Sequence, residues 1–186
     1  DVLEGRVVPG ARVAIIGAGG IGFDVGEFLA EGDGPSPSLD PAAWMREWGV
    51  DPSFERPGGL VPAAPTLPAR EVWLLQRSPG RPGARLGKTT GWIHRSTLKA
   101  KGVQMLGGVA YLGVDDAGLR IRVDDSEQLL PVDHVVVCAG QEPRRDLLDA
   151  LQAAGRVVHL VGGADVAAEL DAKRAIAQAS ALAARL

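Results

Sequence analysis

Six residues near the start of the chain have the spacing of a phosphate-binding turn. Residues 17–22 read Gly-Ala-Gly-Gly-Ile-Gly, which matches the pattern G-x-G-x-x-G. In that pattern Gly17 permits a tight turn, Gly19 lets a pyrophosphate approach the backbone, and Gly22 allows a helix to pack closely on a strand. Amide groups at the helix start then favour the negative phosphates. The motif therefore predicts a dinucleotide site, with a purely structural tight turn as the alternative.

The residues after the next apolar run favour NADP(H) over NAD(H). A site for NAD usually has an acidic residue there for the ribose 2′-hydroxyl, whereas an arginine suits the 2′-phosphate of NADP. Here the run at residues 71–75 is followed by Gln76 and Arg77, with Arg81 and Arg85 further on and no carboxylate among them. The alternative is that these arginines only make a surface loop soluble. The long spacing from the glycine turn departs from the usual pattern.

Residues 87–90, Gly-Lys-Thr-Thr, resemble the end of a kinase-type phosphate loop, but that pattern fails. It requires a glycine at position 82, where this chain has Pro82. Lys88 is therefore interpreted either as a contact to a cofactor phosphate or ribose, or as an ordinary lysine at a helix start.

Two further strand ends are candidates for contact with a cofactor. Ala139 and Gly140 follow an apolar run, so their backbone can approach a ligand at the carboxyl edge of a sheet. Gly163 and Asp165 hold a similar place before the final helix. Asp165 is expected either to cap that helix or to hold a polar cofactor hydroxyl.

The elements that must position these residues alternate between strands and helices. Apolar runs and turn signals predict an α/β fold, Rossmann-like, in which a parallel sheet is interrupted by a small antiparallel meander. Ten of the 13 prolines lie at positions 35–82, so residues 32–70 are expected to form a mostly irregular excursion with one short helix. The expected strands are residues 12–16, 71–75, 103–106, 108–114, 119–123, 128–132, 134–140 and 157–161; the expected helices are residues 41–48, 90–100, 145–154 and 166–186, and one that starts near Ile21 and stops at Gly32.

Composition excludes several classes of protein. The 186 residues are 46% hydrophobic and 23% charged, which is typical of a globular protein. A net charge of −3 argues against a nucleic-acid binder. We find no run of about 20 apolar residues and no signal peptide, so no membrane contact is expected. Cys138 is the single cysteine and the three histidines are scattered, which predicts no metal site and a reducing, cytoplasmic compartment.

Five longer stretches of sequence are informative: GAGGIGFDVGEFL, LGKTTGWIHRSTL, GVQMLGGVAYL, VVVCAGQEPRRDL and HLVGGADVAAELDAKRAIAQ. Together they resemble the C-terminal part of bacterial NADPH-dependent 2,4-dienoyl-CoA reductases, which are old-yellow-enzyme-like proteins. Because these stretches cover nearly the whole chain, the resemblance does not rest on glycine spacing alone.

The resemblance implies that the chain, which starts at Asp1, is a fragment of a longer enzyme. Such enzymes have an N-terminal TIM barrel with FMN and an iron–sulfur cluster, followed by FAD- and NADPH-binding domains. They pass a hydride from NADPH to FAD, and the electrons then reduce an unsaturated fatty acyl-CoA in β-oxidation. By this resemblance residues 1–155 are the NADPH-binding domain, and residues 156–186 are a strand and helix of the FAD-binding domain, with Asp165 near the ribityl chain.

The expected partners are NADPH and the FAD and TIM-barrel domains of the parent chain. We expect no catalytic residue in this chain, because the barrel, the cluster cysteines and the first FAD fingerprint are not in it. The alternatives are the NADPH domain of another old-yellow-enzyme-like reductase, or a nucleotide-binding module without redox chemistry. The predicted cofactor-binding residues are Gly17, Gly19, Gly20, Ile21, Gly22, Gln76, Arg77, Arg81, Lys88, Ala139, Gly140, Gly163 and Asp165.

Overall fold

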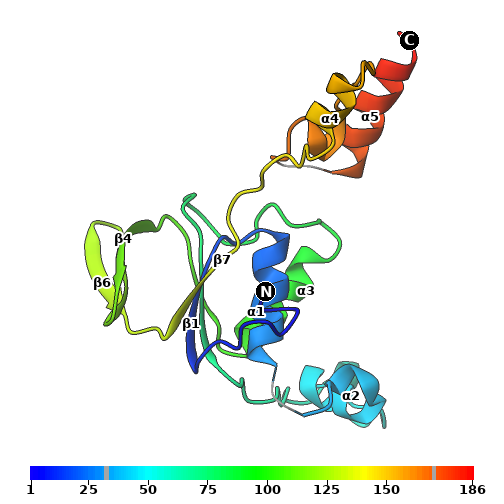
Figure 1. Cartoon of the computed structure of the whole chain (residues 1–186). Helices are drawn as coiled ribbons and strands as arrows, with labels where there is room; N and C mark the ends of the chain where they lie inside the picture. Colours follow the sequence, from blue (N-terminus) through cyan, green and yellow to red (C-terminus); the bar gives the residue numbers. More distant parts are fainter. Residues whose placement is uncertain (32–33, 169–170) are drawn as a thin grey trace. The chain divides into compact units, whose positions relative to one another are not determined.

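Four parallel strands form the central sheet. The computed structural model describes residues 1–31, 34–168 and 171–186, and these fall into two units, Asp1–Ala139 and Gly140–Leu186. The sheet lies in the first unit, with strands in the order β3-β2-β1-β7 (Figure 1). Their bounds are β1 Arg12–Ile16, β2 Glu71–Leu75, β3 Gln104–Leu106 and β7 His134–Val137. The predicted parallel sheet is confirmed, although β7 ends three residues before the predicted limit.

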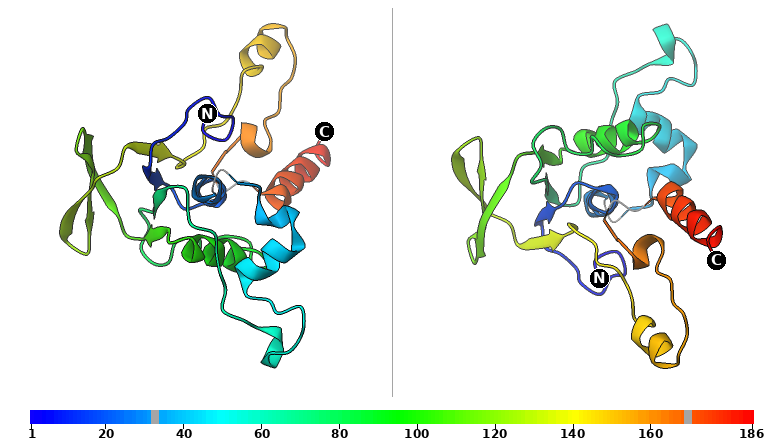
Figure 2. Two further views of the ribbon diagram at one scale, coloured as in Figure 1. Left: turned by 90° about the horizontal axis from the view of Figure 1, so that it is seen from below. Right: turned by 90° about the horizontal axis from the view of Figure 1, so that it is seen from above.

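The two faces of this sheet bury different residues because successive side chains of a strand point to opposite sides. Val13, Ile15 and Leu74 face one hydrophobic cluster, which also contains residues of the helices. Ala14 and Leu75 face a second cluster, which also contains residues of the antiparallel strands. In Figure 2 the helices at residues 20–30 and 91–100 and the meander accordingly lie on opposite sides of the sheet.

Helices α1 (Gly20–Ala30) and α3 (Gly91–Ala100) cover the first face. Leu29 and Leu98 are fully buried between them and the sheet. His94 Nδ1 and the Glu27 carboxylate lie 2.9 Å apart and join the two helices. Both helices were predicted, although the stop predicted for the first at Gly32 lies outside the described residues.

The antiparallel meander is confirmed. Strands β4 (Ala110–Asp115), β5 (Gly118–Val123) and β6 (Ser126–Leu130) pair in sequence order. Leu119 and Ile121 on β5 are buried, while Arg120 between them is exposed. This alternation packs one side of the meander against the sheet.

The proline-rich excursion has a local structure of its own. It contains the 3-10 turns Pro37–Leu39 and Pro57–Gly59 and the predicted helix α2 (Pro41–Trp48). Asp40 caps α2 by accepting a hydrogen bond of 2.9 Å from the Ala42 amide. The predicted one-turn spacing of Trp44 and Trp48 brings their rings to 6.2 Å between centroids.

The second unit differs from prediction at three places: its first helix begins three residues after the predicted start at residue 145, a predicted strand is not formed, and the final helix is shorter. It contains α4 (Leu148–Ala153), the 3-10 turn Gly162–Ala164 and α5 (Ala172–Ala183). The strand predicted at residues 157–161 is wrong: a strand needs a hydrogen-bonded neighbour, and both described sheets consist of strands from the first unit. Val157 is accordingly 85% exposed.

The final helix is shorter than the predicted span of residues 166–186. Asp171 caps it, because its carboxylate accepts a 2.6 Å hydrogen bond from the Arg174 amide. Residues 166–168 are not helical, and positions 169 and 170 lie outside the described residues. The local capping signal therefore decided the start of α5, and apolar periodicity alone placed it too early.

Candidate functional site

Three strands end together at the candidate site. The register pairs Ile16 of β1 with Leu75 of β2 and with Val137 of β7. The ladders continue past the strands, since the Gly17 amide donates to the Leu75 carbonyl and the Cys138 amide donates to the Ile16 carbonyl, both at 2.8 Å. The glycine turn, the loop after β2 and the segment after β7 therefore meet at one edge of the sheet.

Two glycines of the turn are required by the protein itself. Gly17 has a φ of +113°, and a Cβ there would lie 2.6 Å from the Cys138 carbonyl oxygen. A Cβ on Gly22 would lie only 1.8 Å from the Gly17 carbonyl oxygen. Close packing of β1, α1 and β7 thus accounts for both residues.

Gly19 and Gly20, unlike Gly17 and Gly22, are not required by packing within the protein. A Cβ on either residue would meet no neighbouring atom within 4 Å, and both are exposed. Their missing side chains leave a space that the chain does not fill. A pyrophosphate needs such a space to reach the backbone.

The N-terminus of α1 is suited to an anion. Gly19 is the N-cap and supplies no side-chain hydrogen bond, and the first turn of the helix contains no acidic residue. The first helical bond runs from the Phe23 amide to the Gly19 carbonyl, so the amides of Gly20, Ile21 and Gly22 have no partner within the helix. These amides and the helix dipole favour a phosphate.

The loop after β2 places arginines at the same edge. Arg77 and Arg81 are exposed. The charge of Arg77 acts on Tyr111 of β4: burial raises the pKa of Tyr111, and the nearby Arg77 opposes that shift. Nothing in the residue pattern near Tyr111 signals this electrostatic interaction.

Gln76, which we predicted to be a cofactor contact, is half-buried and turns its amide onto its own loop. Its Nε2 atom donates to the carbonyls of Ser78 and Gly80, at 3.0 and 3.3 Å. Lys88 is exposed in the turn that precedes α3, and Arg95 anchors the intervening loop by donating to the Gly83 carbonyl at 2.8 Å. These contacts hold the loops around the site.

Ala139 and Gly140 are exposed after β7, at the junction of the two units. The Ala139 amide would lie 2.9 Å from a Cβ at Gly17, so its backbone borders the glycine turn. Gly140 has a φ of +83° and open space where a Cβ would be. Ala139 thus brings the end of the first unit against the glycine turn.

Gly163 and Asp165 lie in the second unit, in and after the 3-10 turn. Asp165 does not cap α5, since Asp171 does. Instead its carboxylate accepts a 2.5 Å hydrogen bond from Gln178 of α5, whose other amide atom accepts from Gly162 at 2.7 Å. A hollow of about 370 Å³ adjoins this pair, lined by Val158, His159, Leu160, Val161, Asp165, Gln178, Leu182 and Arg185.

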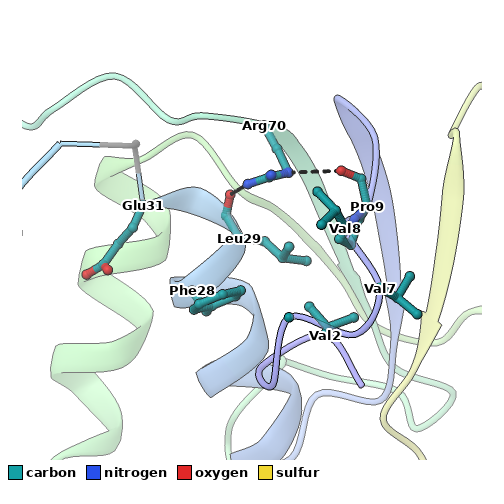
Figure 3. A pocket seen from close by; sticks show the side chains of 9 residues that line it. Val2, Val7, Val8, Pro9, Phe28, Leu29, Glu31 and Arg70 are labelled. Atoms are coloured by element: carbon teal, nitrogen blue, oxygen red, sulfur yellow. Dashed lines mark hydrogen bonds between the residues drawn. The ribbon is translucent and has the colours of Figure 1, made fainter.

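A second hollow, of about 220 Å³, lies at the opposite end of α1 from the glycine turn. Val2, Val8 and Phe28 are among its mostly apolar lining residues (Figure 3). Arg70 at its rim donates to the carbonyls of Pro9 and Leu29, each at 3.4 Å. Because this hollow lies away from the glycine turn and the three strand ends, it does not belong to the candidate site.

The remaining reactive residues have structural surroundings. Burial raises the pKa of the Cys138 thiol, so the thiolate form is disfavoured. His134 accepts a hydrogen bond of 3.0 Å from the Gly10 amide. Within the described ranges no three His, Cys, Asp or Glu residues are placed to hold a metal ion. None of the described helices is long and apolar enough to cross a membrane.

Comparison with known proteins identifies the family. Residues 2–170 match the pyridine nucleotide-disulphide oxidoreductases. The chain belongs to this family. Its members are oxidoreductases that bind FAD and NAD(P), which agrees with the α/β fold and the glycine turn described above.

Two relatives are informative. A metal reductase of Desulforamulus reducens is 25% identical over 166 residues, which cover 88% of this chain and 23% of the relative. The solved structure of a 2-naphthoyl-CoA reductase complex shares the fold, with a TM-score of 0.60, 18% identity and coverage of 96% of this chain and 21% of that one. The chain thus spans less than a quarter of either relative.

Proposed function

We propose that this chain binds NADPH and delivers its hydride to FAD within a larger enzyme similar to 2,4-dienoyl-CoA reductase. The observation that supports this most strongly is the unfilled space at Gly19 and Gly20, at a helix start bordered by the ends of three strands. The pyrophosphate would sit there on the amides of Gly20, Ile21 and Gly22. Bound NADPH supplies the hydride, and FAD accepts it.

The chain's own residues have distinct roles in this proposal. Arg77, with Arg81 nearby in sequence, binds the 2′-phosphate through charge-assisted hydrogen bonds. Lys88 contacts a phosphate or the ribose. The backbone of Ala139 and Gly140 borders the nicotinamide and keeps it beside the strand ends, where it faces the flavin.

We further propose that residues 1–155 form the NADPH-binding domain and that residues 156–186 belong to the FAD-binding domain. The Gln178 amide fixes the Asp165 carboxylate and the Gly162 backbone, and this fixed turn would present Gly163 and Asp165 to FAD. The partners are then the remainder of the FAD domain and a TIM barrel with FMN and an iron–sulfur cluster. A cytoplasmic location is part of the same proposal.

The main alternative to a dienoyl-CoA reductase is a related reductase that acts on another substrate. The naphthoyl-CoA reductase and the metal reductase are named for substrates other than a dienoyl-CoA, and each shares this fold or sequence along most of the chain. The NADPH domain of another old-yellow-enzyme-like reductase would have the same site. Substrate assays on the full-length enzyme with a 2,4-dienoyl-CoA, an aromatic CoA thioester and a ferric chelate separate these possibilities.

Nucleotide titration of the 186-residue chain tests the site. We expect NADPH to bind more tightly than NADH, and Arg77→Ala to weaken NADPH binding by about 10- to 150-fold, because one charged hydrogen bond contributes about 1.5–3 kcal/mol. NADH binding should change little. Arg6→Ala is the matched control, since Arg6 is exposed and pairs with Asp1 in the N-terminal segment. Equal loss of both nucleotides in Arg77→Ala would refute the assignment of Arg77.

A nucleotide-binding module without redox chemistry is the remaining alternative. In the full-length protein, NADPH should bleach the flavin absorbance at a rate that falls in Arg77→Ala. Binding of NADPH without any reduction of flavin would favour the module.

A further inference from the structure

One side chain, that of Gln76, holds the loop that carries Arg77 from within. Gln76 is the first residue after β2, and its Nε2 atom donates to the carbonyls of both Ser78 and Gly80. The Gln76 backbone is held as well, since its amide donates to Leu106 at 2.9 Å and its carbonyl accepts from Val109 at 3.0 Å. The backbone of Gln76 is therefore fixed by its amide and its carbonyl, so that the side chain can hold the two loop carbonyls in place.

The segment after β3 also holds the loop that carries Arg77. The Gly108 amide donates to the Ser78 carbonyl at 2.9 Å. A Cβ on Gly107 would lie 2.0 Å from the Gly80 carbonyl oxygen, so only a glycine allows the loop to approach this closely. The Ser78 carbonyl thus receives hydrogen bonds from two directions, and the Gly80 carbonyl sits against Gly107 and the Gln76 amide.

Arg77 lies between the anchor residue and the two held carbonyls. A long, exposed arginine loses rotamer entropy when a ligand orders it, and a mobile loop would add to that cost. The charge of Arg77 opposes the rise in the pKa of Tyr111 on β4. Because Gln76 and Gly107 hold the loop of residues 77–80, the backbone that carries Arg77 is positioned before any ligand arrives.

We propose that Gln76 is a positioning residue for 2′-phosphate recognition: its amide fixes the loop of residues 77–80 so that Arg77 is presented at the carboxyl edge of the sheet. This rests on the proposed function. It assigns the preference for NADPH to a pair of residues rather than to Arg77 alone. An amide suits this role because its nitrogen has two N–H donors, one for each carbonyl, whereas a glutamate would oppose the same carbonyls.

A double-mutant cycle tests the proposal. Gln76→Met keeps the size of the side chain but removes both donors. We expect it to weaken NADPH binding by about 3- to 10-fold, the cost of ordering one long side chain, and to leave NADH binding within about twofold. In the absence of Arg77 there is nothing to position, so the double variant Gln76→Met/Arg77→Ala should bind NADPH as Arg77→Ala does. Gln104→Met is the control, because Gln104 is exposed on β3.

A second readout needs no nucleotide. Tyr111 is the only tyrosine in the chain, so the tyrosinate absorbance reports its titration alone. Arg77→Ala should raise the pKa of Tyr111 further, and Gln76→Met should do the same by letting Arg77 move away. Circular dichroism along the titration confirms that each variant stays folded.

The outcomes separate the two proposals. Additive losses in the double variant, equal losses for NADPH and NADH in Gln76→Met, or an unchanged Tyr111 titration in that variant would each overturn the role of Gln76. If the native chain shows no preference for NADPH, the proposed function fails. In that case the Tyr111 titration still decides whether Gln76 positions Arg77.

Discussion

Replacing Gly22 by alanine should destabilise the packing of α1 against the sheet. The new Cβ would lie 1.8 Å from the Gly17 carbonyl oxygen, although contacts below 3.0 Å are essentially never seen for a real Cβ. The helix start and the glycine turn must therefore separate by about 1.2 Å. Both groups belong to the backbone, so no side-chain rotation relieves the overlap.

The expected cost follows from what that separation disrupts. Helix α1 carries Phe23 and Leu29, which are 1% and 0% exposed in the first hydrophobic cluster. Overpacking in a core typically costs about 1–3 kcal/mol, and a clash of backbone with backbone belongs at the upper end, about 3 kcal/mol. For a chain of this length that corresponds to a fall in Tm of about 6–12 °C.

Thermal unfolding followed by circular dichroism measures this fall, and two neighbouring glycines are matched controls. Gly20→Ala meets no atom within 4 Å and adds a better helix former, so stability should stay the same or rise by up to about 1 kcal/mol. Gly19→Ala should cost no more than about 1 kcal/mol as an N-cap change. It should nonetheless weaken NADPH binding by about tenfold or more, because its methyl group would occupy the proposed pyrophosphate space and cost at least one hydrogen bond.

Two results would refute this reasoning. A Gly22→Ala variant that melts within about 2 °C of the native chain, a shift worth less than about 1 kcal/mol, would show that the turn is not packed as described. Destabilisation of Gly19→Ala as large as that of Gly22→Ala would show that the open space at Gly19 is filled by the protein.

Three further predictions concern other parts of the chain. The Arg12 guanidinium and amide hold the pKa of Asp133 below its ordinary value of 3.8, so Asp133→Asn should lower the urea midpoint at pH 7. That difference should begin to shrink near pH 3.8, where Asp133 of the unfolded chain takes up a proton, and should be lost once the pH is below the lowered native pKa of Asp133; a pH-independent difference would contradict it. Gln178→Leu should speed hydrogen exchange of the Gly162 amide by about fivefold, the value of one net hydrogen bond, and an unchanged rate would show that this contact is not held. Burial raises the pKa of Cys138, so a disulfide reagent at pH 8 should label it slowly in the native chain and quickly in urea, whereas rapid native labelling would show an exposed thiolate.

Most elements could be predicted because their signals are local. The apolar run at residues 12–16, the glycines that follow it and the helix start after Gly19 all lie within one short stretch. The meander followed from alternating residues around a turn, and α2 followed from its Asp40 cap. Each of these depends on residues a few positions apart.

The two larger errors have different causes: a predicted strand needed a partner far along the chain, and the start of the final helix was set by a local cap that the apolar pattern does not show. Residues 157–161 have the composition of a strand but no described strand to pair with. The final helix has the right apolar periodicity, yet its start was fixed by Asp171. Hydrophobic pattern predicts that a segment can be buried, but not what it will be buried against.

The same distinction holds for the site. The amino-acid sequence alone determined the glycine turn, the arginines after the second strand and the oxidoreductase family to which they point, because these are properties of contiguous residues. The motif already predicted the tight turn at Gly17, the open approach at Gly19 and the close packing at Gly22. Only the tertiary structure decided which atoms a Cβ at Gly17 and Gly22 would meet, that Gly20 also leaves space, and that the Gln76 amide faces its own loop. Those roles arise from contacts with the segments after β7 and β3, and the parallel sheet brings these segments together only when the chain folds.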